Sequence, residues 1–466
     1  MASMSNTVLP LCLGLLVVLQ VSTAQVSSFG GSPLQSVVAR GFRGDQQRQQ
    51  CRFEHLAAVE ATHQQRSEAG FTEYFNTEAR DEFRCAGVNV RRMVVESKGL
   101  VLPTYANAHK LVYIVQGRGV LGIAMPGCPA TFQQMATASS SSEAQLSTRK
   151  LMDEHQQLQH VIDNSNNANQ LDPRPREFYM AGKPRSSWQQ QPYQAEQQSN
   201  NQNIFAGFNP DMLAEALGVS RQTVIRLQGQ NDQRGAIIRV EHGLQAVQPS
   251  FQTEPATEEQ SQEEEEEYVQ RAASCSGQQN GLDEIMCASK LTKNINNPQS
   301  TDIFNPRGGR ITRANSQNFP ILNTIQMSAT RTVLQNNALL APHWTMNAHT
   351  VMYVTAGQGR IQVVDHRGRS VFDGELHQQQ ILLIPQNFVV SVKAQREGFA
   401  WVSFKTNHNA IDSQIAGKAS VLRALPVDVI ANAYRLSREE SRSLKFNRGD
   451  EMAVFAPRNG EQINQQ

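Results

Sequence analysis

The sequence has no long apolar run after its first 24 residues, which argues against a membrane-spanning helix. No later stretch approaches the roughly 18 continuous apolar residues that such a helix needs. Clusters of basic residues are also missing, because Lys and Arg are scattered singly among Gln, Asn and apolar residues. A nucleic-acid-binding surface gathers its positive charge on one face or along one helix. We therefore expect neither a membrane nor a nucleic acid as a partner.

Lysine is scarce, and the polar residues that dominate instead are rich in nitrogen. Of 43 basic residues 33 are Arg and 10 are Lys, and Gln and Asn together make up about one residue in six. A polar linker would explain the Gln cluster at residues 189–202 taken alone. The bias runs through the whole chain, however, and it is typical of a protein whose value lies in its amino acids.

The net charge of +1 hides an asymmetry between the two halves of the chain. Residues 25–280 carry 23 Lys and Arg against 28 Asp and Glu, a net charge of −5, whereas residues 281–466 carry 20 against 14, a net charge of +6. The two halves, with net charges of opposite sign, are therefore expected to attract each other.

The 466 residues suffice for two or three domains with sizeable cores.

The first 24 residues predict a secretory signal peptide. Residues 9–19 form an apolar core, and the small residues Ser22 and Ala24 stand three and one before the cleavage that we expect between Ala24 and Gln25. The run is too short to span a bilayer with ease, although it lacks the usual positive charge near Met1. The pattern predicts export into an oxidising compartment.

Cysteines exported to such a compartment are expected to form disulfides. Of six cysteines, Cys12 would leave with the signal peptide. An odd number remains, so one cysteine stays free or pairs outside the chain, and the spacing does not fix the connectivity. Cys275 lies in a polar, acidic tract, and it is the cysteine that we expect to remain outside the disulfide pairs. The remaining cysteines are Cys51, Cys85, Cys128, Cys275 and Cys287.

The stretch around Asn280-Gly281 predicts an exposed hinge. A solvated run at residues 263–267, all Glu, precedes it, and well-patterned apolar sequence follows it. Asn-Gly between apolar runs would indicate a hairpin turn, but the Glu tract is a poor preceding strand. We therefore favour an exposed loop that is open to a protease. Cys287 could tether the downstream piece after a cut, which suggests a precursor that becomes two linked chains.

An internal repeat divides the chain into two copies of one module. Residues 107–119 align without gaps on residues 347–359, at a constant offset of 240. Residues 211–216 resemble residues 428–433, and each opens a segment of helical period whose next turn carries Ser220 or Ser437.

The second copy predicts an antiparallel sandwich or barrel followed by helices. Many short strands with regular turns are typical of that architecture. Helical sequence begins at Val427, and Ser437 with Glu440 has the spacing of a capping box. In the first copy we expect strands at 71–75, 88–95 and 111–123. In the second copy β-rich runs occur at residues 321–327, 350–355, 359–364, 370–372, 380–384, 388–392 and 399–404.

The first copy does not match the second between Gly119 and Ala181. Where the second copy supplies strands from residue 381 to 404, the first supplies a serine run and a polar, helix-like stretch at 151–161. At least two strands, and by our count three, are absent. We expect residues 139–161 to form a helix or loop outside the sheet, and the barrel to stay open, with ladder groups unpaired.

Several short motifs belong together, namely Asn280-Gly281-Leu282, Pro126-Gly127-Cys128-Pro129, Ala341-Pro342-His343-Trp344, Val371-Phe372-Asp373-Gly374-Glu375-Leu376, Ile384-Pro385-Gln386-Asn387 and residues 111–119 and 423–429. They resemble those of the legumin-type (11S) seed storage globulins, a two-cupin family. The resemblance implies a mainly β fold of two jelly-roll barrels, each followed by a small helical region. The gap in the internal repeat leaves the N-terminal barrel incomplete near Val161 and Ile162. We expect four segments, namely a signal peptide (1–24), an acidic module (25–248), an acidic linker (249–280) and a basic module (281–466).

The resemblance also implies a maturation pathway. An asparaginyl endopeptidase would cut between Asn280 and Gly281, and the protein would form trimers that pair into hexamers in a seed storage vacuole. Disulfides would join Cys51 to Cys85 and Cys128 to Cys287. Family members carry a further segment that this chain lacks between Val161 and Ile162, so the chain is a truncated paralogue or a gene model that misses coding sequence.

The rival interpretation is a cupin metal enzyme. Such a site commonly uses two His one residue apart, a Glu a few residues on and a further His from a later strand. Here His343 and His349 are six residues apart with no Glu between His349 and Gly359, and His109 stands alone in the first copy. A sugar-binding protein is a third possibility that no particular residue favours. We therefore expect no metal, no cofactor and no catalytic activity.

Overall fold

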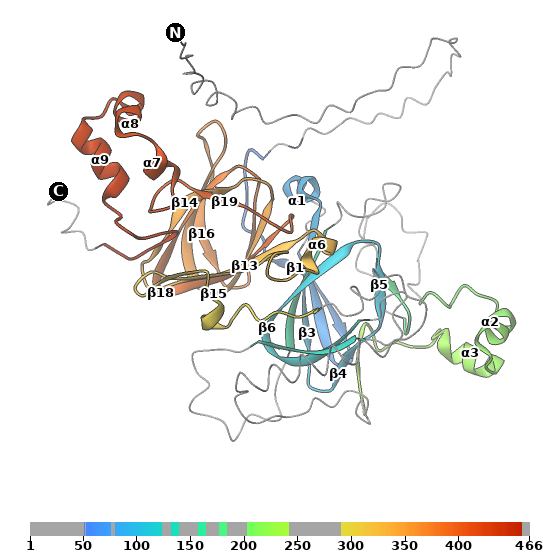
Figure 1. The fold of residues 1–466 in the computed structure, drawn as a ribbon. Coiled ribbons are helices and arrows are strands. Elements are labelled where there is room, and N and C mark those ends of the chain that lie inside the picture. The colour runs from blue at the N-terminus through green and yellow to red at the C-terminus, as the bar shows by residue number, and fades with distance from the viewer. Residues whose placement is uncertain are drawn as a thin grey trace, which may run out of the picture. The chain divides into compact units, whose positions relative to one another are not determined.

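The computed structural model describes residues 51, 53–75, 80–123, 132–138, 157–164, 177–183, 203–241 and 290–458, and all statements below concern these residues. They form two β-rich modules, each followed by a pair of short helices (Figure 1). Within the described ranges, no helix combines the length and the hydropathy that crossing a bilayer requires.

The second module is a barrel of ten antiparallel strands. Two long strands, β15 and β18, pair with each other over most of their length, and they also pair with β16, β17, β13 and β14 at their two ends. The strands are β11 (Ile303–Asn305), β12 (Gly309–Ala314), β13 (Ser328–Leu334), β14 (Leu339–Thr345), β15 (Thr350–Val364), β16 (Ser370–His377), β17 (Ile381–Ile384), β18 (Val389–Lys405), β19 (Asp412–Gln414) and β20 (Val454–Phe455).

The helices of the second module are short. A capping box begins α9, because the Ser437 hydroxyl accepts from the backbone N–H of Glu440 while the Glu440 carboxylate accepts from that of Ser437. This cap is the one that the sequence predicts. The helices are η4 (Pro298–Ser300), α6 (Leu322–Ile325), α7 (Val421–Ala424), α8 (Val427–Tyr434) and α9 (Arg438–Phe446).

The core of the second barrel follows the two-residue period of its strands. Ile361, Val363, Phe399 and Trp401 are each at most 2% exposed and face the barrel interior. Strand β17 is buried at all four positions, because its residues alternate between this core and a cluster shared with the first module. Burial on both faces explains the continuous apolar run Ile-Leu-Leu-Ile.

The first module repeats this design with fewer paired strands. Its main sheet has the order β1-β2-β3-β8-β6-β7. The elements are β1 (Ala61–Ser67), β2 (Gly70–Phe75), α1 (Asp81–Ala86), β3 (Val88–Val95), β4 (Gly99–Val101), β5 (Thr104–Ala106), β6 (His109–Ile123), β7 (Phe132–Ala138), β8 (Gln157–Asn164), β9 (Glu177–Tyr179), α2 (Pro210–Leu217), α3 (Arg221–Leu227) and β10 (Ile237–Arg239).

The pairings show that the repeat is structural. Strand β6 pairs with β7 and β8 as β15 pairs with β16 and the second half of β18. Gly117 and Gly357 occupy the same corner of the two long strands, with φ of 92° and 72°. A Cβ on Gly357 would lie 2.2 Å from the Gly398 carbonyl oxygen, which explains why the repeat keeps Gly there.

Strand β8 corrects our expectation for the first module. Residues 157–161, which we expected outside the sheet, belong to this strand between β3 and β6. The place of the second half of β18 is therefore filled, and among the described residues two strands lack a counterpart, β17 and the first half of β18. The expectation of at least two missing strands is confirmed for the described residues, and β8 fills the third place that we had counted as empty. Residues 139–156 lie outside the described residues.

The sequence of β8 is nevertheless unsuited to this place. Gln157 stands opposite Val95 as Phe399 stands opposite Leu334 in the second barrel. By the same register, Gln159 takes the position of Trp401, because each pairs with the equivalent residue of β3 or β13. The polar segment nevertheless forms a strand that pairs with β3 on one side and β6 on the other. This is possible because strand preference depends strongly on context.

Several other boundaries differ from the prediction. Residues 322–325 form helix α6 rather than a strand, because Phe319, Leu322 and Ile325 recur at intervals of three and pack in one cluster. The runs at 350–355 and 359–364 are a single strand, and so are those at 388–392 and 399–404. The predicted strands at 71–75, 88–95 and 111–123 are confirmed.

The two modules share a hydrophobic cluster. Phe75, Phe83 and Val90 of the first module pack in it with Tyr353 and Phe404 of the second. Each of these side chains is at most 2% exposed. The cluster joins residues that lie on opposite sides of the predicted hinge, so a cut in the hinge would leave this contact in place.

Candidate functional site

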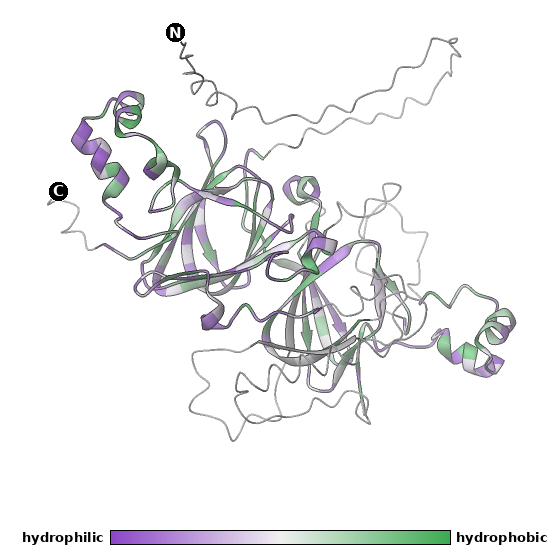
Figure 2. Ribbon diagram, in the orientation of Figure 1, coloured by the Kyte–Doolittle hydropathy of each residue, from purple (hydrophilic) through white to green (hydrophobic). Residues whose placement is uncertain are grey.

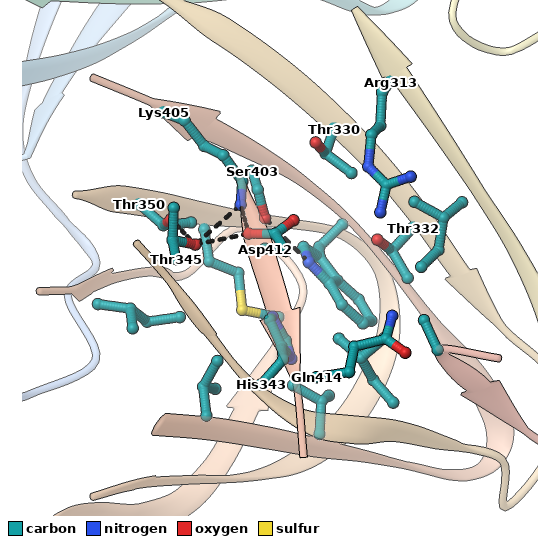
Figure 3. Close-up of a pocket in the computed structure, with 18 residues that line it drawn as sticks. Arg313, Thr330, Thr332, His343, Thr345, Thr350, Ser403, Lys405, Asp412 and Gln414 are labelled. Carbon is teal, nitrogen blue, oxygen red and sulfur yellow. Dashed lines mark hydrogen bonds and ion pairs between the residues drawn. The ribbon is translucent and has the colours of Figure 1, made fainter. Parts of the chain in front are cut away.

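The interior of the second barrel contains a cavity of about 50 Å³ (Figure 3). Alternate residues of β12, β13, β14 and β18 line it, because every second side chain of a strand faces the same way. Its polar lining residues are Arg313, Thr330, Thr332, His343, Thr345, Thr350, Ser403, Lys405, Asp412 and Gln414.

A buried ion pair lies at one side of this cavity. The Lys405 ammonium donates to Asp412 Oδ1 and, at 2.9 Å, to Thr345 Oγ1, while the Thr345 hydroxyl donates to Asp412 Oδ1 at 2.7 Å. The side chains of Lys405 and Asp412 are 5% and 13% exposed. Burial by itself raises the pKa of Asp412, but the charge of Lys405 outweighs burial and the pKa lies at about 2. The carboxylate is therefore ionised at neutral pH.

The first module holds a similar network around Glu177. The Arg91 guanidinium donates to Glu177 Oε1 at 2.8 Å, Lys110 Nζ donates to it at 2.6 Å, and the Thr104 hydroxyl donates to it at 3.2 Å. Burial raises the pKa of Glu177, but the two cations outweigh burial and hold the pKa far below its usual range. Each barrel thus contains a carboxylate that stays ionised inside the protein.

The strand register shows that these carboxylates are equivalent. Glu177 of β9 pairs with Ala106 of β5, and Asp412 of β19 pairs with Thr345 of β14. Their cations come from different strands, however. Lys405 ends β18 in the second barrel, whereas Arg91 and Lys110 lie on β3 and β6 in the first.

The histidines of the second barrel do not form a metal site. His343 Nδ1 lies 2.9 Å from the Ala341 carbonyl oxygen, and burial lowers the pKa of His343. His349 Nδ1 accepts from the Gln386 backbone N–H at 3.2 Å, outside the cavity lining. The Lys405 ammonium beside the cavity would repel a cation. No group of three His, Cys, Asp or Glu side chains suited to a metal ion occurs in the part of the chain described.

The helix pairs after each barrel carry the second group of notable residues. An ion pair of 2.9 Å joins Asp211 to Arg221 in the first pair, and another of 2.9 Å joins Asp428 to Arg438 in the second. Figure 2 shows hydrophobic segments on α2, α3, α8 and α9. The exposed apolar residues of these helices are Met212, Leu217, Ile225, Val429, Tyr434, Leu444 and Phe446.

An arm of residues 53–60 connects the first module to the second barrel. The Leu56 backbone N–H donates to the Val371 carbonyl oxygen at 2.9 Å. Val59 and Ile381 exchange two backbone hydrogen bonds, each of 2.9 Å. The arm therefore adds backbone pairing to the shared cluster.

A disulfide ties the start of this arm to helix α1. It joins Cys51 to Cys85, whose Cα atoms are 5.8 Å apart across a sequence separation of 34. A loop of that length stabilises the fold by about 3–4 kcal/mol in a chain-entropy model. This is the pairing that the sequence resemblance implies.

The other predicted site residues lie outside the described residues, so the predictions made for them stay predictions. They comprise the hinge, the signal cleavage site, the second disulfide and the leftover cysteine, that is Asn280, Gly281, Ala24, Gln25, Cys128, Cys287 and Cys275.

Comparison with known proteins places this architecture in a family. A family model described as Cupin matches residues 57–171 and 293–442. Glutelin type-A 1 of rice (Oryza sativa subsp. japonica) is 47% identical over 443 residues, which covers 88% of each chain. 12S seed storage globulin 2 of oat (Avena sativa) is 44% identical over 491 residues, covering 94% of this chain and 92% of the oat protein.

A solved structure agrees. Procruciferin, an 11S globulin from Brassica napus, is 33% identical with a TM-score of 0.71, and the match covers 88% of this chain and 98% of procruciferin. The chain belongs to the legumin-type (11S) seed storage globulins. This globulin is thus a seed storage protein of plant origin, and its named relatives are storage proteins rather than enzymes.

The alignment with the rice relative also bears on the gap in the first barrel. It spans 443 positions, whereas 88% of the 466 residues of this globulin is about 410 residues. At least about 30 aligned positions, the difference between 443 and 410, therefore have no residue of this chain. A missing internal segment, alone or together with shorter gaps elsewhere in the alignment, accounts for such a difference.

Apart from His343, sequence reasoning missed the polar residues that line the cavity and surround Glu177. Glu177 lies 86 residues from Arg91 and 67 from Lys110, so no local pattern connects them. A usable signal for Arg313 was its place two residues after the apolar Ile311 in a strand, where the two-residue period puts a charge on the inner face.

Proposed function

We propose that this globulin is a nitrogen and amino-acid reserve, made as a secretory precursor and deposited in the protein storage vacuoles of seeds. The observation that carries the proposal is the 47% identity to rice glutelin type-A 1 over 88% of both chains. The abundance of Gln, Asn and Arg supports it, because these side chains store extra nitrogen. The predicted signal peptide supports entry into the secretory pathway.

We propose that an asparaginyl endopeptidase cuts the precursor between Asn280 and Gly281. The products would be an acidic chain of residues 25–280 with a net charge of −5 and a basic chain of residues 281–466 with a net charge of +6. The shared hydrophobic cluster and the opposite charges favour continued association after the cut. A disulfide between Cys128 and Cys287 would add a covalent link.

Self-association into trimers, and into hexamers after cleavage, is the final part of the proposal. The two helix pairs support it, because they expose large apolar side chains such as Met212, which is 60% exposed, and Tyr434, which is 57% exposed. Exposed apolar residues gathered on one element are typical of surfaces that bind another protein. The partner in this case is a second copy of the chain.

Digestion of the purified precursor with an asparaginyl endopeptidase tests the maturation. We expect two chains on reducing gels, one larger species without reductant, and a smaller chain whose N-terminal residue is Gly281. After digestion of the same chain with a family segment restored after Val161, light scattering should show the mass double as trimers pair. A smaller chain that begins elsewhere, or an intact precursor after digestion, would contradict the proposed maturation but not the family membership.

A further inference from the structure

The cavity of the second barrel is large enough for a small molecule. One water molecule needs roughly 10–15 Å³ of comparable volume, and the cavity has about 50 Å³. It therefore has room for roughly three to five waters, or for one organic ion of about four to five non-hydrogen atoms. The storage role makes no use of this space.

The charges around the cavity do not cancel. Arg313 and Lys405 contribute two positive charges and Asp412 one negative charge. Asp412 is engaged by Lys405, whereas the Arg313 guanidinium has no ion-pair or hydrogen-bond partner anywhere in the described ranges. Asp302 contacts Arg313 through the backbone and not through the guanidinium, because its carboxylate accepts from the Arg313 backbone N–H at 2.6 Å. One positive charge at the cavity wall is thus left over.

Hydroxyl groups lie on the next two strands along the same inner face, because Arg313 pairs with Thr330 and Thr330 pairs with Ser403. Figure 3 shows Thr330 and Thr332 next to the Arg313 guanidinium. The Ser403 hydroxyl oxygen accepts from Trp401 Nε1–H at 3.2 Å, so the Ser403 hydroxyl proton remains to be donated. These groups offer donors to the oxygens of an anion.

The remaining wall of the cavity is apolar. Leu340, Met352, Val390 and Val392 line it, and Trp401 is 2% exposed. A monatomic inorganic anion would leave this wall without contacts. A small organic acid instead places its carboxylate among the donors and its methyl group against the apolar side chains, where removal of apolar surface from water favours binding.

We propose that the interior of the second barrel binds a small monocarboxylate of the size of acetate or propionate, with Arg313 as its charge partner and Thr332 and Ser403 as hydrogen-bond donors. The planar guanidinium matches a carboxylate with two parallel hydrogen bonds. The low dielectric of a barrel interior strengthens that interaction. The described part of the first module lacks the charge partner, because Tyr74 pairs with Arg91 there as Arg313 pairs with Thr330 here.

Ligand-detected NMR on the full-length precursor tests this site. Saturation transfer to the methyl protons of acetate, propionate and acetamide is measured at constant ionic strength, because acetamide has nearly the shape of acetate but no charge. We expect saturable transfer to acetate and propionate, and none to acetamide. Displacement of acetate by chloride or nitrate at equal concentration would show an unspecific anion site and overturn the assignment to carboxylates.

Two variants and one control locate the binding site. Arg313→Gln should weaken acetate binding about 10- to 100-fold, the usual effect of a hydrogen bond to a charged group. Thr332→Val, which keeps the shape of the side chain, should weaken it about 2- to 10-fold. Arg360→Gln is the matched control, since Arg360 pairs with Asp373 on the outer face of the same barrel with 60% of its side chain exposed.

Three results would overturn the proposal, namely no transfer to acetate, equal transfer to acetamide, or full binding by the Arg313→Gln protein. Circular dichroism of each variant shows whether its fold is retained. Should the printed chain aggregate, the same chain with a family segment restored after Val161 contains an unchanged second barrel. The same comparison of variants then decides the question.

Discussion

Restoring the missing segment of the first barrel should convert this chain into a stable protein. The change is an insertion between Val161 and Ile162 of the residues that rice glutelin type-A 1 has at the aligned positions. The insertion would supply counterparts of β17 and of the first half of β18, which the described part of the first module lacks. It would also displace Gln157 and Gln159 from the strand positions where the second barrel has Phe399 and Trp401.

The second barrel gives the magnitude of the effect. Its β17 and the first half of β18 bury six large apolar side chains, each at most 7% exposed, namely Ile381, Leu382, Leu383, Ile384, Val390 and Val392. At about 1.5–3 kcal/mol for each buried side chain, these contribute roughly 9–18 kcal/mol. The net stability of a domain is about 5–15 kcal/mol, so their loss is enough to leave the first module unfolded.

Calorimetry and light scattering measure the outcome. We expect the printed chain to aggregate or to lack a cooperative transition for the first module, and the restored chain to form soluble trimers with one. The matched control is a Gly/Ser insertion of the same length at the same place, which adds residues but no apolar side chains. A soluble, cooperatively unfolding trimer made from the printed chain would refute this reasoning.

Two further predictions concern covalent and ionic links. After cleavage, Cys287→Ser should let the two chains separate in denaturant without reductant on a gel, and chains that stay joined would make Cys275 the true partner of Cys128. Because the folded pKa of Asp412 is depressed to about 2, its ionised form stabilises the fold above pH 4, and about 2 kcal/mol should be lost as the pH falls from about 4 to 2. Urea unfolding of the second barrel at pH 4, 3 and 2 should show this loss in the native chain and not in Asp412→Asn, and equal slopes in both would disprove the role of the ion pair.

The sequence predicts those parts of the fold that local pattern determines. The repeat at an offset of 240 residues identified two modules, and helix α9 begins at the Ser437 capping box as expected. Periodicity failed where one strand bends through a corner, since Gly357 interrupts the alternation inside β15 and made one strand look like two. Periodicity also failed at β8, where it predicted a helix or loop for a polar segment that in fact pairs with a strand on each side.

The interior sites could not be predicted because their side chains meet only through strand pairing. Lys405 and Asp412 are seven residues apart in sequence, but their contact depends on the pairing of Lys405 with Thr350 of β15 and of Asp412 with Thr345 of β14. The cations that pair with Glu177 lie on β3 and β6, which are 86 and 67 residues earlier in the sequence. Such pairs become visible only when the register of the strands is known.

The level of this protein in seeds before and after germination tests the central claim of a storage role most directly. Quantitative peptide mass spectrometry of dry seeds, leaves and seedlings of the source plant would measure it. The storage role predicts an abundant protein in dry seeds, absent from leaves, that is degraded within days of imbibition. A protein that is absent from dry seeds, or whose level stays constant through germination, would contradict the storage role.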